Sequence, residues 1–449
     1  MRPTKAKDYP AAGAPCGPPS ASPQASVSAE ETQASTSPES SQQPLQDSRR
    51  ACSPADPASV HAIDADVPAA VGRVLGQILS ERTAQAATLD PAFASDLADR
   101  VARFTLEGGK RTRSQLVWWA LRACGGTARQ AEAALHIGAA LEIIQTCALV
   151  HDDVMDASQL RRGRPSLHAD VQAQYAGPAT IEQVARFGEA TAILAGDLAL
   201  AWADDVLTET DLTPDIRNQV RDLWRAMRTE MVAGQYLDLH GQITSSRSLA
   251  RAIRAACLKS AVYTVERPLA LGAALAGADT ATTTALCSAG RCFGIAFQLR
   301  DDLHDVFGSP QHTGKPSGGD IRSGKPTYLM AVAQARAEAV DDRHALTVLK
   351  SSLGCAELTE AGLTAVRRVL VTTGAQKTVE SKIDRLVAQG MRHFDSVLLE
   401  PVGNRRLRAL LLHAAGVLPA PSSSSRPSEA EDGLSVPLLL AAAGEGKTR

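Results

Sequence analysis

Apolar residues recur at helical spacing through most of residues 67–415, whereas stretches that alternate apolar with polar residues are nearly absent. Alanine and leucine dominate, and this composition favours helices over strands. Caps and breaking residues divide the pattern into separate helices. The predicted helices are Val67–Ser80, Pro91–Thr105, Thr112–Cys124, Ala128–Met155, Ile181–Thr208, Pro214–Leu239, Ser248–Ala276, Ala281–Val306, Tyr328–Leu353, Glu360–Thr373, Gln376–Leu398 and Asn404–Ala415. Since broad apolar faces must be covered, the pattern predicts an all-α, large single-domain helical bundle with a central active-site cavity.

The two ends of the chain differ from this central part. Residues 1–60 are rich in Pro, Ser, Ala and Gln, and they contain too few large apolar side chains to offset the entropy of ordering. Residues 419–449 carry a serine run and acidic residues. We therefore expect two disordered tails around a folded domain of residues 61–418. A transit peptide is the alternative for the first tail, but its acidic residues favour a plain tail.

Composition narrows the classes of function. The chain has 47 basic and 49 acidic residues, so no overall basic bias points to nucleic acid and any phosphate binding must be local. The 8 cysteines lack metal-ligand spacing and are typical of small buried residues in a reducing compartment. We find no apolar run near the roughly 20 residues that span a bilayer. The protein is expected to be soluble and cytoplasmic.

The fourth predicted helix ends in a cluster of acidic residues. Helical periodicity puts Asp152, Asp153 and Asp156 on one face, where their negative charges would repel each other. A divalent cation bound between them would relieve this repulsion. Arg161 and Arg162 follow within two turns, and their forked donors suit phosphate oxygens. The segment therefore indicates a site for a metal-bound diphosphate.

A solvated helix face with local ion pairs is the ordinary interpretation of such a charge run. A second copy of the acidic pattern argues against it. Asp301, Asp302 and Asp305 repeat the spacing within F-Q-L-R-D-D-L-H-D-V-F-G, again in an apolar helical context. Two such clusters are improbable by chance.

These two motifs resemble those of the trans-isoprenyl diphosphate synthases, or polyprenyl synthetases, and in particular geranylgeranyl diphosphate synthases of the actinobacterial type. The resemblance runs from about Ala70 to Val417 and includes further motifs in the family's order. These are E-G-G-K-R-T-R-S at Glu107–Ser114, A-G-Q-Y-L-D-L at Ala233–Leu239, K-S-A-V-Y-T-V-E-R-P at Lys259–Pro268 and T-G-K-P-S-G-G-D-I-R-S-G-K-P-T at Thr313–Thr327. The resemblance implies the isoprenoid synthase type of helical bundle.

Three positions depart from the family pattern. Ser114 stands where the family usually has Pro, and Ser260 stands where it usually has Thr. Gln145 occupies a position where many bacterial members have His. None of these changes removes a charge or a metal ligand, so they bear on fine positioning within the site.

The resemblance implies that the two acidic motifs bind Mg²⁺, which grips the diphosphate of an allylic substrate. The implied metal ligands are Asp152, Asp153, Asp156, Asp301, Asp302 and Asp305. Asp153 and Asp302 rank lower and are expected to be outer or alternative ligands. His151 adjoins the first cluster, but magnesium prefers oxygen, so we interpret His151 as structural.

The resemblance also assigns the residues that bind substrates. Those implied for isopentenyl diphosphate are Lys110, Arg113, Gln145 and Arg162. Those implied for an allylic diphosphate (dimethylallyl, geranyl or farnesyl) are Arg161, Lys259, Lys315 and Lys325. Those implied near the developing allylic cation are Ser260, Tyr263 and Gln298. The predicted catalytic set is Asp152, Asp156, Lys259, Tyr263, Gln298 and Asp301. By spacing alone, a surface charge is the simpler interpretation of a lysine or arginine, and a packed side chain is the simpler interpretation of Tyr263 or Gln298.

The function implied by the resemblance is head-to-tail condensation of isopentenyl diphosphate with an allylic diphosphate, by a homodimer as is usual in the family. A class I terpene cyclase is the nearest alternative, but cyclases generally lack both the second Asp-rich motif and the Lys110–Arg113 segment. A non-catalytic partner subunit is another, but such subunits typically lose acidic-motif residues, and all are present here.

Product length is predicted from the helix that precedes the first acidic motif. Cys147 and Ala148 are small, whereas synthases that stop at farnesyl diphosphate commonly place bulky aromatic residues there. One prenyl unit spans about 5 Å, close to one 5.4 Å helical turn, so a floor lowered to Ile144 or Leu141 admits roughly one more unit. We expect geranylgeranyl diphosphate, with longer polyprenyl diphosphates as the alternative. A second alternative is that another helix closes the pocket.

Overall fold

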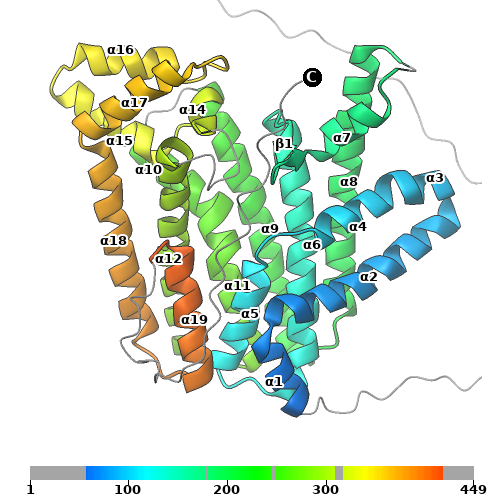
Figure 1. The fold of residues 1–449 in the computed structure, drawn as a ribbon. Coiled ribbons are helices and arrows are strands. Elements are labelled where there is room, and N and C mark those ends of the chain that lie inside the picture. Colours follow the sequence, from blue (N-terminus) through cyan, green and yellow to red (C-terminus); the bar gives the residue numbers. More distant parts are fainter. Residues whose placement is uncertain (1–56, 178, 245–247, 309–316, 418–449) are drawn as a thin grey trace, which may run out of the picture. The chain divides into compact units, whose positions relative to one another are not determined.

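The structure is a computed structural model that describes residues 57–177, 179–244, 248–308 and 317–417, all within one compact unit, Cys52–Arg449 (Figure 1). The predicted tails lie outside the described residues, except that residues 57–60 form the first turn of helix α1. The predicted domain boundary at residue 60 therefore falls inside a helix.

The described elements are almost all helical. The helices are α1 (Pro57–Ala65), α2 (Val67–Leu89), α3 (Pro91–Phe93), π-helix η1 (Ala94–Ala98), α4 (Asp99–Leu106), α5 (Thr112–Ala123), 3₁₀-helix η2 (Ala128–Gln130), α6 (Ala131–Met155), α7 (Leu167–Gln174), α8 (Ile181–Glu209), α9 (Pro214–Ile243), α10 (Leu249–Ala256), π-helix η3 (Cys257–Glu266), α11 (Arg267–Ala276), α12 (Thr280–Phe307), α14 (Gly319–Arg322), α15 (Tyr328–Ala339), α16 (Arg343–Ser352), α17 (Glu360–Thr372), α18 (Ala375–Phe394) and α19 (Pro401–Ala414). In this part of the chain, the strands are the short β1 (Leu160–Arg161) and β2 (Arg164–Pro165), paired antiparallel. The predicted all-α class is confirmed.

Local signals explain where several long helices begin. Asp66 caps α2 by accepting a hydrogen bond from the backbone N–H of Ala69. Thr180 and Gln183 form a reciprocal capping box at the start of α8. Asp279 caps α12 through the N–H of Thr282. Each cap satisfies backbone donors that the first helical turn leaves unpaired.

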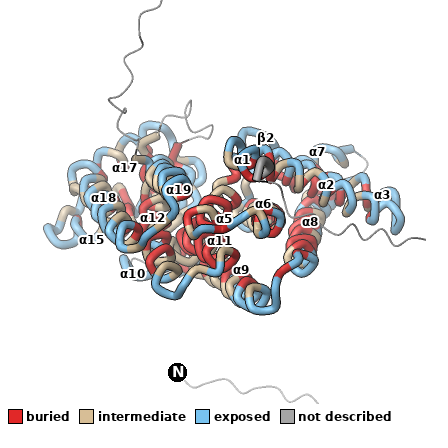
Figure 2. The backbone as a smooth tube through the Cα atoms, turned by 90° about the horizontal axis from the view of Figure 1, so that it is seen from below, coloured by how far each residue is buried: buried red, intermediate tan, exposed pale blue. Residues whose placement is uncertain are grey.

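The helices pack into a bundle around α6, α11 and η3. Helix α6 lies against α5 on one side and α8 on another, while α11 packs on α5, α9 and α12. The π-helix η3 lies between α9 and α12, and α18 covers a further side of α12. Buried residues are concentrated on α5, α6 and α11, and Figure 2 shows α5 and α11 largely buried. The charged ends of α6 and α12 are thereby fixed by an apolar core.

Helix α6 resembles a membrane-spanning helix in its length and apolar composition. By length and composition, residues 128–155 could cross a bilayer, with a mean hydropathy of 1.6 over the best window, so the expectation that no such run exists was wrong. However, 72% of that window is buried inside the protein. The apolarity of α6 is explained by its central place in the core, where Leu141, Ile143 and Ile144 are fully buried.

Four predicted helices are divided in the structure. Pro91–Thr105 is divided into α3, η1 and α4, and Ala128–Met155 begins with the 3₁₀-helix η2. The segment predicted as Ser248–Ala276 is divided into α10, η3 and α11, because ten residues wind as a π-helix. The segment predicted as Tyr328–Leu353 breaks at Asp341, whose φ of 49° is left-handed. Helices α1, α7 and α14 and the β1–β2 hairpin were not predicted.

Candidate active site

The first acidic motif lies at the end of α6, and its three carboxylates have different surroundings. The Asp152 carboxylate accepts hydrogen bonds from Lys259 Nζ at 3.0 Å and Gln235 Nε2 at 3.1 Å. Asp156 is the C-cap of α6 and pairs with Lys325 Nζ at 2.9 Å. Asp153 is fully buried. The motif therefore presents Asp152 and Asp156 to cations and turns Asp153 into the protein.

Arg161 holds Asp152 and Asp153 from the β1–β2 hairpin. Its Nε donates to Asp153 Oδ1 at 2.8 Å, and one terminal nitrogen contacts both Asp153 and Asp152. The hairpin can turn back on α6 because Arg162 and Gly163 both have positive φ, at 53° and 76°. Burial raises the pKa of Asp153 despite Arg161. Asp153 thus acts here as the anchor of Arg161.

Lys259 lies between two carboxylates. Besides Asp152, its ammonium contacts Asp238 Oδ2 at 2.8 Å. Burial alone would lower the pKa of Lys259, but Asp238 and Asp152 outweigh this effect and raise it. Burial would likewise raise the pKa of Asp152, yet Lys259, Lys325 and Arg161 lower it. Both groups are held in their charged forms.

The π-helix η3 delivers Lys259 to this position because glycines let its neighbours approach closely. A Cβ on Gly234 of α9 would lie 2.3 Å from the Lys259 backbone nitrogen. A Cβ on Gly294 of α12 would lie 2.6 Å from the backbone of Ala261. Any side chain at either glycine would push η3 away. The wide turns of η3 are typical of functional sites.

The second acidic motif, on α12, has a more strongly repulsive environment. Asp301 is exposed, whereas Asp302 is 5% exposed and accepts a hydrogen bond from Gln298 Nε2 at 2.8 Å. Burial, followed by the charge of Asp320, raises the pKa of Asp302 well above its ordinary value. Burial also raises the pKa of Asp305, even though backbone N–H groups of Asp320 and Gly319 oppose the shift.

Lys325 and Asp320 connect the two acidic motifs. Lys325 Nζ lies 2.9 Å from Asp156 of the first motif and 3.7 Å from Asp320. The backbone N–H of Asp320 donates to Asp305 Oδ2 of the second motif at 3.0 Å. Burial raises the pKa of Asp320 to about 7, although Lys325 opposes this. In Figure 1, β1 and α14 accordingly lie at the same end of the bundle.

The residues predicted to bind isopentenyl diphosphate are distributed around the start of α5. Lys110 is exposed, and the Arg113 guanidinium lies over the Tyr263 ring at 4.4 Å and donates to Thr264 Oγ1 at 2.9 Å. Arg162 lies over the Phe104 ring at 5.7 Å. Gln145 Oε1 is buried with no hydrogen-bond partner among the described residues, so it can still accept a donor.

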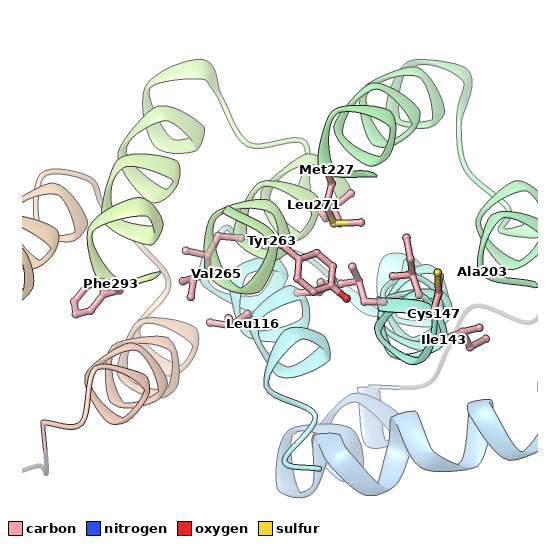
Figure 3. Close-up of a cluster of buried hydrophobic side chains, with 14 of the residues drawn as sticks. Leu116, Ile143, Cys147, Ala203, Met227, Tyr263, Val265, Leu271 and Phe293 are labelled. Carbon is pink, nitrogen blue, oxygen red and sulfur yellow. The ribbon is translucent and has the colours of Figure 1, made fainter. Parts of the chain in front are cut away.

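The residues predicted near the allylic cation lie between η3 and α12. Tyr263 is 3% exposed, and its hydroxyl has no hydrogen-bond partner in the described part of the chain. Figure 3 shows Tyr263 in the apolar cluster that contains Cys147 of α6 and Met227 of α9. Ser260 is half-buried on η3, and Gln298 faces Asp302. Lys315 lies outside the described residues.

Three residues of this charged end were not predicted individually. Gln235 donates to Asp152, and Asp238 accepts from Lys259. The backbone N–H of Asp320 donates to Asp305 of the second motif. The i, i+3 spacing of Gln235 and Asp238 in A-G-Q-Y-L-D-L was a signal for one shared helix face. Asp320 offered a weaker signal, because an acidic residue in a glycine-rich loop is ordinarily a turn residue.

The donor set fits magnesium, which binds carboxylate oxygens. Within the described residues, no three His, Cys, Asp or Glu side chains are already gathered around one point, because Lys259, Lys325 and Arg161 separate the carboxylates. Burial is the first cause of the raised pKa of Asp302, Asp305 and Asp320, and neighbouring carboxylates add to it, so a bound cation would favour the charged form of these groups.

His151 has a structural environment, in agreement with its predicted role. Its ring fits against α8 because residue 196 is glycine: a Cβ there would lie 2.0 Å from Nε2. The Nε2 atom lies 3.0 Å from the Ile193 carbonyl oxygen on α8. Nε2 therefore carries the proton, and Nδ1 faces Cys147 Sγ at 3.8 Å. His151 joins α6 to α8 and points away from the carboxylates of the motif.

Comparisons with known proteins agree with this geometry. The polyprenyl synthetase family model matches residues 95–363. The crystal structure of geranylgeranyl pyrophosphate synthase from Corynebacterium glutamicum, in complex with isoprenyl diphosphate and magnesium, is 37% identical, with a TM-score of 0.74 over 78% of this chain and 98% of that chain.

Curated relatives of similar sequence have different products. (2E,6E)-farnesyl diphosphate synthase from Mycobacterium tuberculosis is 31% identical over 283 residues, covering 63% of this chain and 72% of the relative. Geranylgeranyl diphosphate synthase from Methanosarcina mazei is 28% identical over 266 residues, covering 59% and 76%. Their names state that one makes farnesyl diphosphate and the other geranylgeranyl diphosphate. The chain belongs to the polyprenyl synthetase family and is a trans-prenyltransferase that elongates isoprenyl diphosphates.

Proposed function

We propose that this enzyme condenses isopentenyl diphosphate head-to-tail with allylic diphosphates in a magnesium-dependent reaction, and that its main product is geranylgeranyl diphosphate. The observation that carries the first part is the arrangement of cations around both acidic motifs. Lys259 contacts Asp152, and Lys325 connects Asp156 to Asp320 beside Asp305. A diphosphate at this end of the bundle meets positive donors and metal ligands together.

The side chains divide the work of the reaction. Asp152, Asp156, Asp301 and Asp305 would hold Mg²⁺, with Asp153 and Asp302 supporting them. When bound, the metal neutralises charge that develops on the departing diphosphate. Arg161, Lys259 and Lys325 bind that diphosphate, and Lys315 is proposed to join them.

The second substrate is held from the start of α5. Lys110, Arg113, Gln145 and Arg162 bind and orient isopentenyl diphosphate, so that its double bond attacks the allylic cation. Oxygens of Ser260, Tyr263 and Gln298 stabilise the cation. The proton lost from the new chain passes to the released diphosphate, and the allylic product can be elongated again.

Product length is proposed from the sizes of the residues that precede Asp152 on α6. Cys147 is 3% exposed, and Ile144 and Leu141 before it are fully buried. Small residues at Cys147 and Ala148 would leave the allylic tail room to pass, and the larger side chains one and two turns earlier would stop it. These sizes support a C20 product over a C15 product.

The test replaces both Cys147 and Ala148 by Phe and follows product length by chromatography, with isopentenyl diphosphate and each allylic starter. We expect a shift towards farnesyl diphosphate. Leu398→Phe, at a fully exposed position outside α6, is the matched control and should leave the distribution unchanged. An unchanged distribution in an active double variant would show that another element closes the pocket.

The same assay separates the alternatives. A terpene cyclase would release hydrocarbon from the allylic diphosphate without isopentenyl diphosphate, and a non-catalytic subunit would be inactive alone. A longer-chain synthase would accumulate products beyond C20. The acidic-motif residues and Lys110 and Arg113 are all present, so we expect neither a cyclase nor an inactive subunit. The residue sizes on α6 lead us to expect no main product beyond C20.

We also propose a cytoplasmic homodimer. Phe187, Ile193 and Leu194 on α8 and Val232 and Tyr236 on α9 are 47–64% exposed, which supports a second copy covering these helices. Sedimentation equilibrium of the full chain should give twice the monomer mass, and Leu194→Asp should lower the association constant. A monomeric parent protein would contradict the proposal.

A further inference from the structure

A buried hydrogen-bond network lies beneath the proposed isopentenyl diphosphate site. Ser114, in the first turn of α5, is 1% exposed, and its Oγ lies 2.7 Å from Glu142 Oε1 and 2.9 Å from the Gly138 carbonyl. A serine hydroxyl has one proton, so it can donate fully to only one of these acceptors. The shorter contact to the charged carboxylate is the stronger one.

The other oxygen of Glu142 faces Arg111. Arg111 NH1 lies 3.3 Å from Glu142 Oε2, and both side chains are nearly inaccessible to solvent. Arg111 NH2 also donates to the carbonyls of Thr105 at 3.3 Å and Leu106 at 2.9 Å, at the end of α4. The network therefore joins α4, α5 and α6, and losing any member leaves buried polar groups unpaired.

The network lies between the residues that the proposed function assigns to isopentenyl diphosphate. Arg111 separates Lys110 from Arg113 in the sequence and takes a left-handed φ of 50°, which turns the chain into α5. Glu142 is three residues before Gln145, almost one turn of α6. Helices α5 and α6 also meet here, because a Cβ on Gly138 would lie 3.1 Å from Ser114 Cβ.

We infer that Ser114, Glu142 and Arg111 form a positioning network that sets the separation of Lys110 and Arg113 on α5 from Gln145 on α6, and so tunes affinity for isopentenyl diphosphate. The inference rests on the proposed function.

The test compares Ser114→Ala and Glu142→Gln with the parent enzyme by steady-state kinetics for each substrate, and by calorimetric titration of isopentenyl diphosphate in magnesium buffer. We expect KM and Kd for isopentenyl diphosphate to rise roughly 3- to 10-fold in both variants, since each loses a hydrogen bond or charge pair inside the network. KM for the allylic substrate and kcat should change by less than about 2-fold.

Ser95→Ala is the matched control, because Ser95 is exposed and its hydroxyl bonds only within its own helical segment, to Ala92. Glu142→Gln decides the question if Ser114→Ala does not fold, since glutamine keeps an acceptor for Ser114. Equal KM changes for both substrates, or none, would overturn the inference. Failure of the parent enzyme to bind isopentenyl diphosphate would instead overturn the proposed function.

Discussion

The two acidic motifs have the same D-D-x-x-D spacing but differ in the cations near them. At the end of α6, Arg161, Lys259 and Lys325 surround the carboxylates and lower the pKa of Asp152. On α12, burial and neighbouring carboxylates raise the pKa of Asp302, and burial also raises the pKa of Asp153 at the equivalent position of the first motif. The second carboxylate is therefore buried in both motifs, and the difference between them lies in the cations that other elements bring to the first.

The two acidic motifs differ in how far side chains of the protein already neutralise them. The first motif is already neutralised by side chains that can also hold a diphosphate. Near the second motif, Lys325 Nζ lies 3.7 Å from Asp320, and the backbone N–H of Asp320 donates to Asp305. We therefore expect the second motif to depend more on a bound cation. Perturbing each end separately should reveal this difference.

The largest effect is expected from removing one ligand at either end. Asp152→Ala and Asp301→Ala should each lower kcat/KM for condensation by about 100-fold or more, because each removes charge that acts on the transition state. Circular dichroism should show an intact fold, since neither residue belongs to the apolar core. A near-parent rate in either variant would contradict the two-motif site.

Metal binding should depend more on the second motif. Magnesium at 100 times its Kd would stabilise the protein by about 2.7 kcal/mol, measured as a rise in Tm over the chelated protein. Asp305→Asn should remove most of this rise, whereas Asp153→Asn should preserve more of it, because Asp153 is engaged by Arg161. Equal losses would show that both motifs contribute alike.

Lys259→Met should act mainly through the first motif. It leaves Asp152 and Asp238 without their shared cation, and we expect a loss of roughly 1–2 kcal/mol in unfolding free energy, discounted because Lys259 is 26% exposed. KM for the allylic substrate should rise as well. Lys350→Met, at an exposed position, is the control for chemical denaturation.

The smallest effect concerns pH near the first motif. Burial lowers the pKa of His168, beside Ser166, from 6.5, so the unfolded chain takes up this proton more readily than the folded protein. The stability from neutral His168 is present above pH 6.5 and is lost as pH falls through the lowered pKa. His168→Asn should flatten the pH dependence of the unfolding free energy between pH 6.5 and 5 by less than about 1 kcal/mol, measured by chemical denaturation.

The sequence predicted most long helices because their signals are local. Helix α5 begins at Thr112 and α9 at Pro214, as expected. The interruption at η3 was missed because a π-helix uses the same residues as an α-helix, and only the tertiary contacts at Gly234 and Gly294 distinguish it. The break at Asp341 was missed because no glycine or proline marks it.

The same limit applies to the site. Sequence spacing found both acidic motifs but placed Asp153 on the same face as Asp152 and Asp156. The structure buries Asp153 against Arg161, which comes from a hairpin that periodicity does not reveal. The partnership of Lys259 with Asp238 joins residues of different helices, so it depends on packing that no single segment encodes.

The π-helix η3 has a consequence for how this chain tolerates change in length. Ten consecutive residues wind more widely than in an α-helix, so removing one residue would let the segment relax into α-helical turns. This relaxation takes up the missing residue, so α10 and α11 would keep nearly the same rotation about the helix axis, whereas a deletion inside an α-helix rotates the two flanking parts by about 100°. In a mutational scan, η3 should therefore tolerate a single-residue deletion better than the α-helical turns of α11 do.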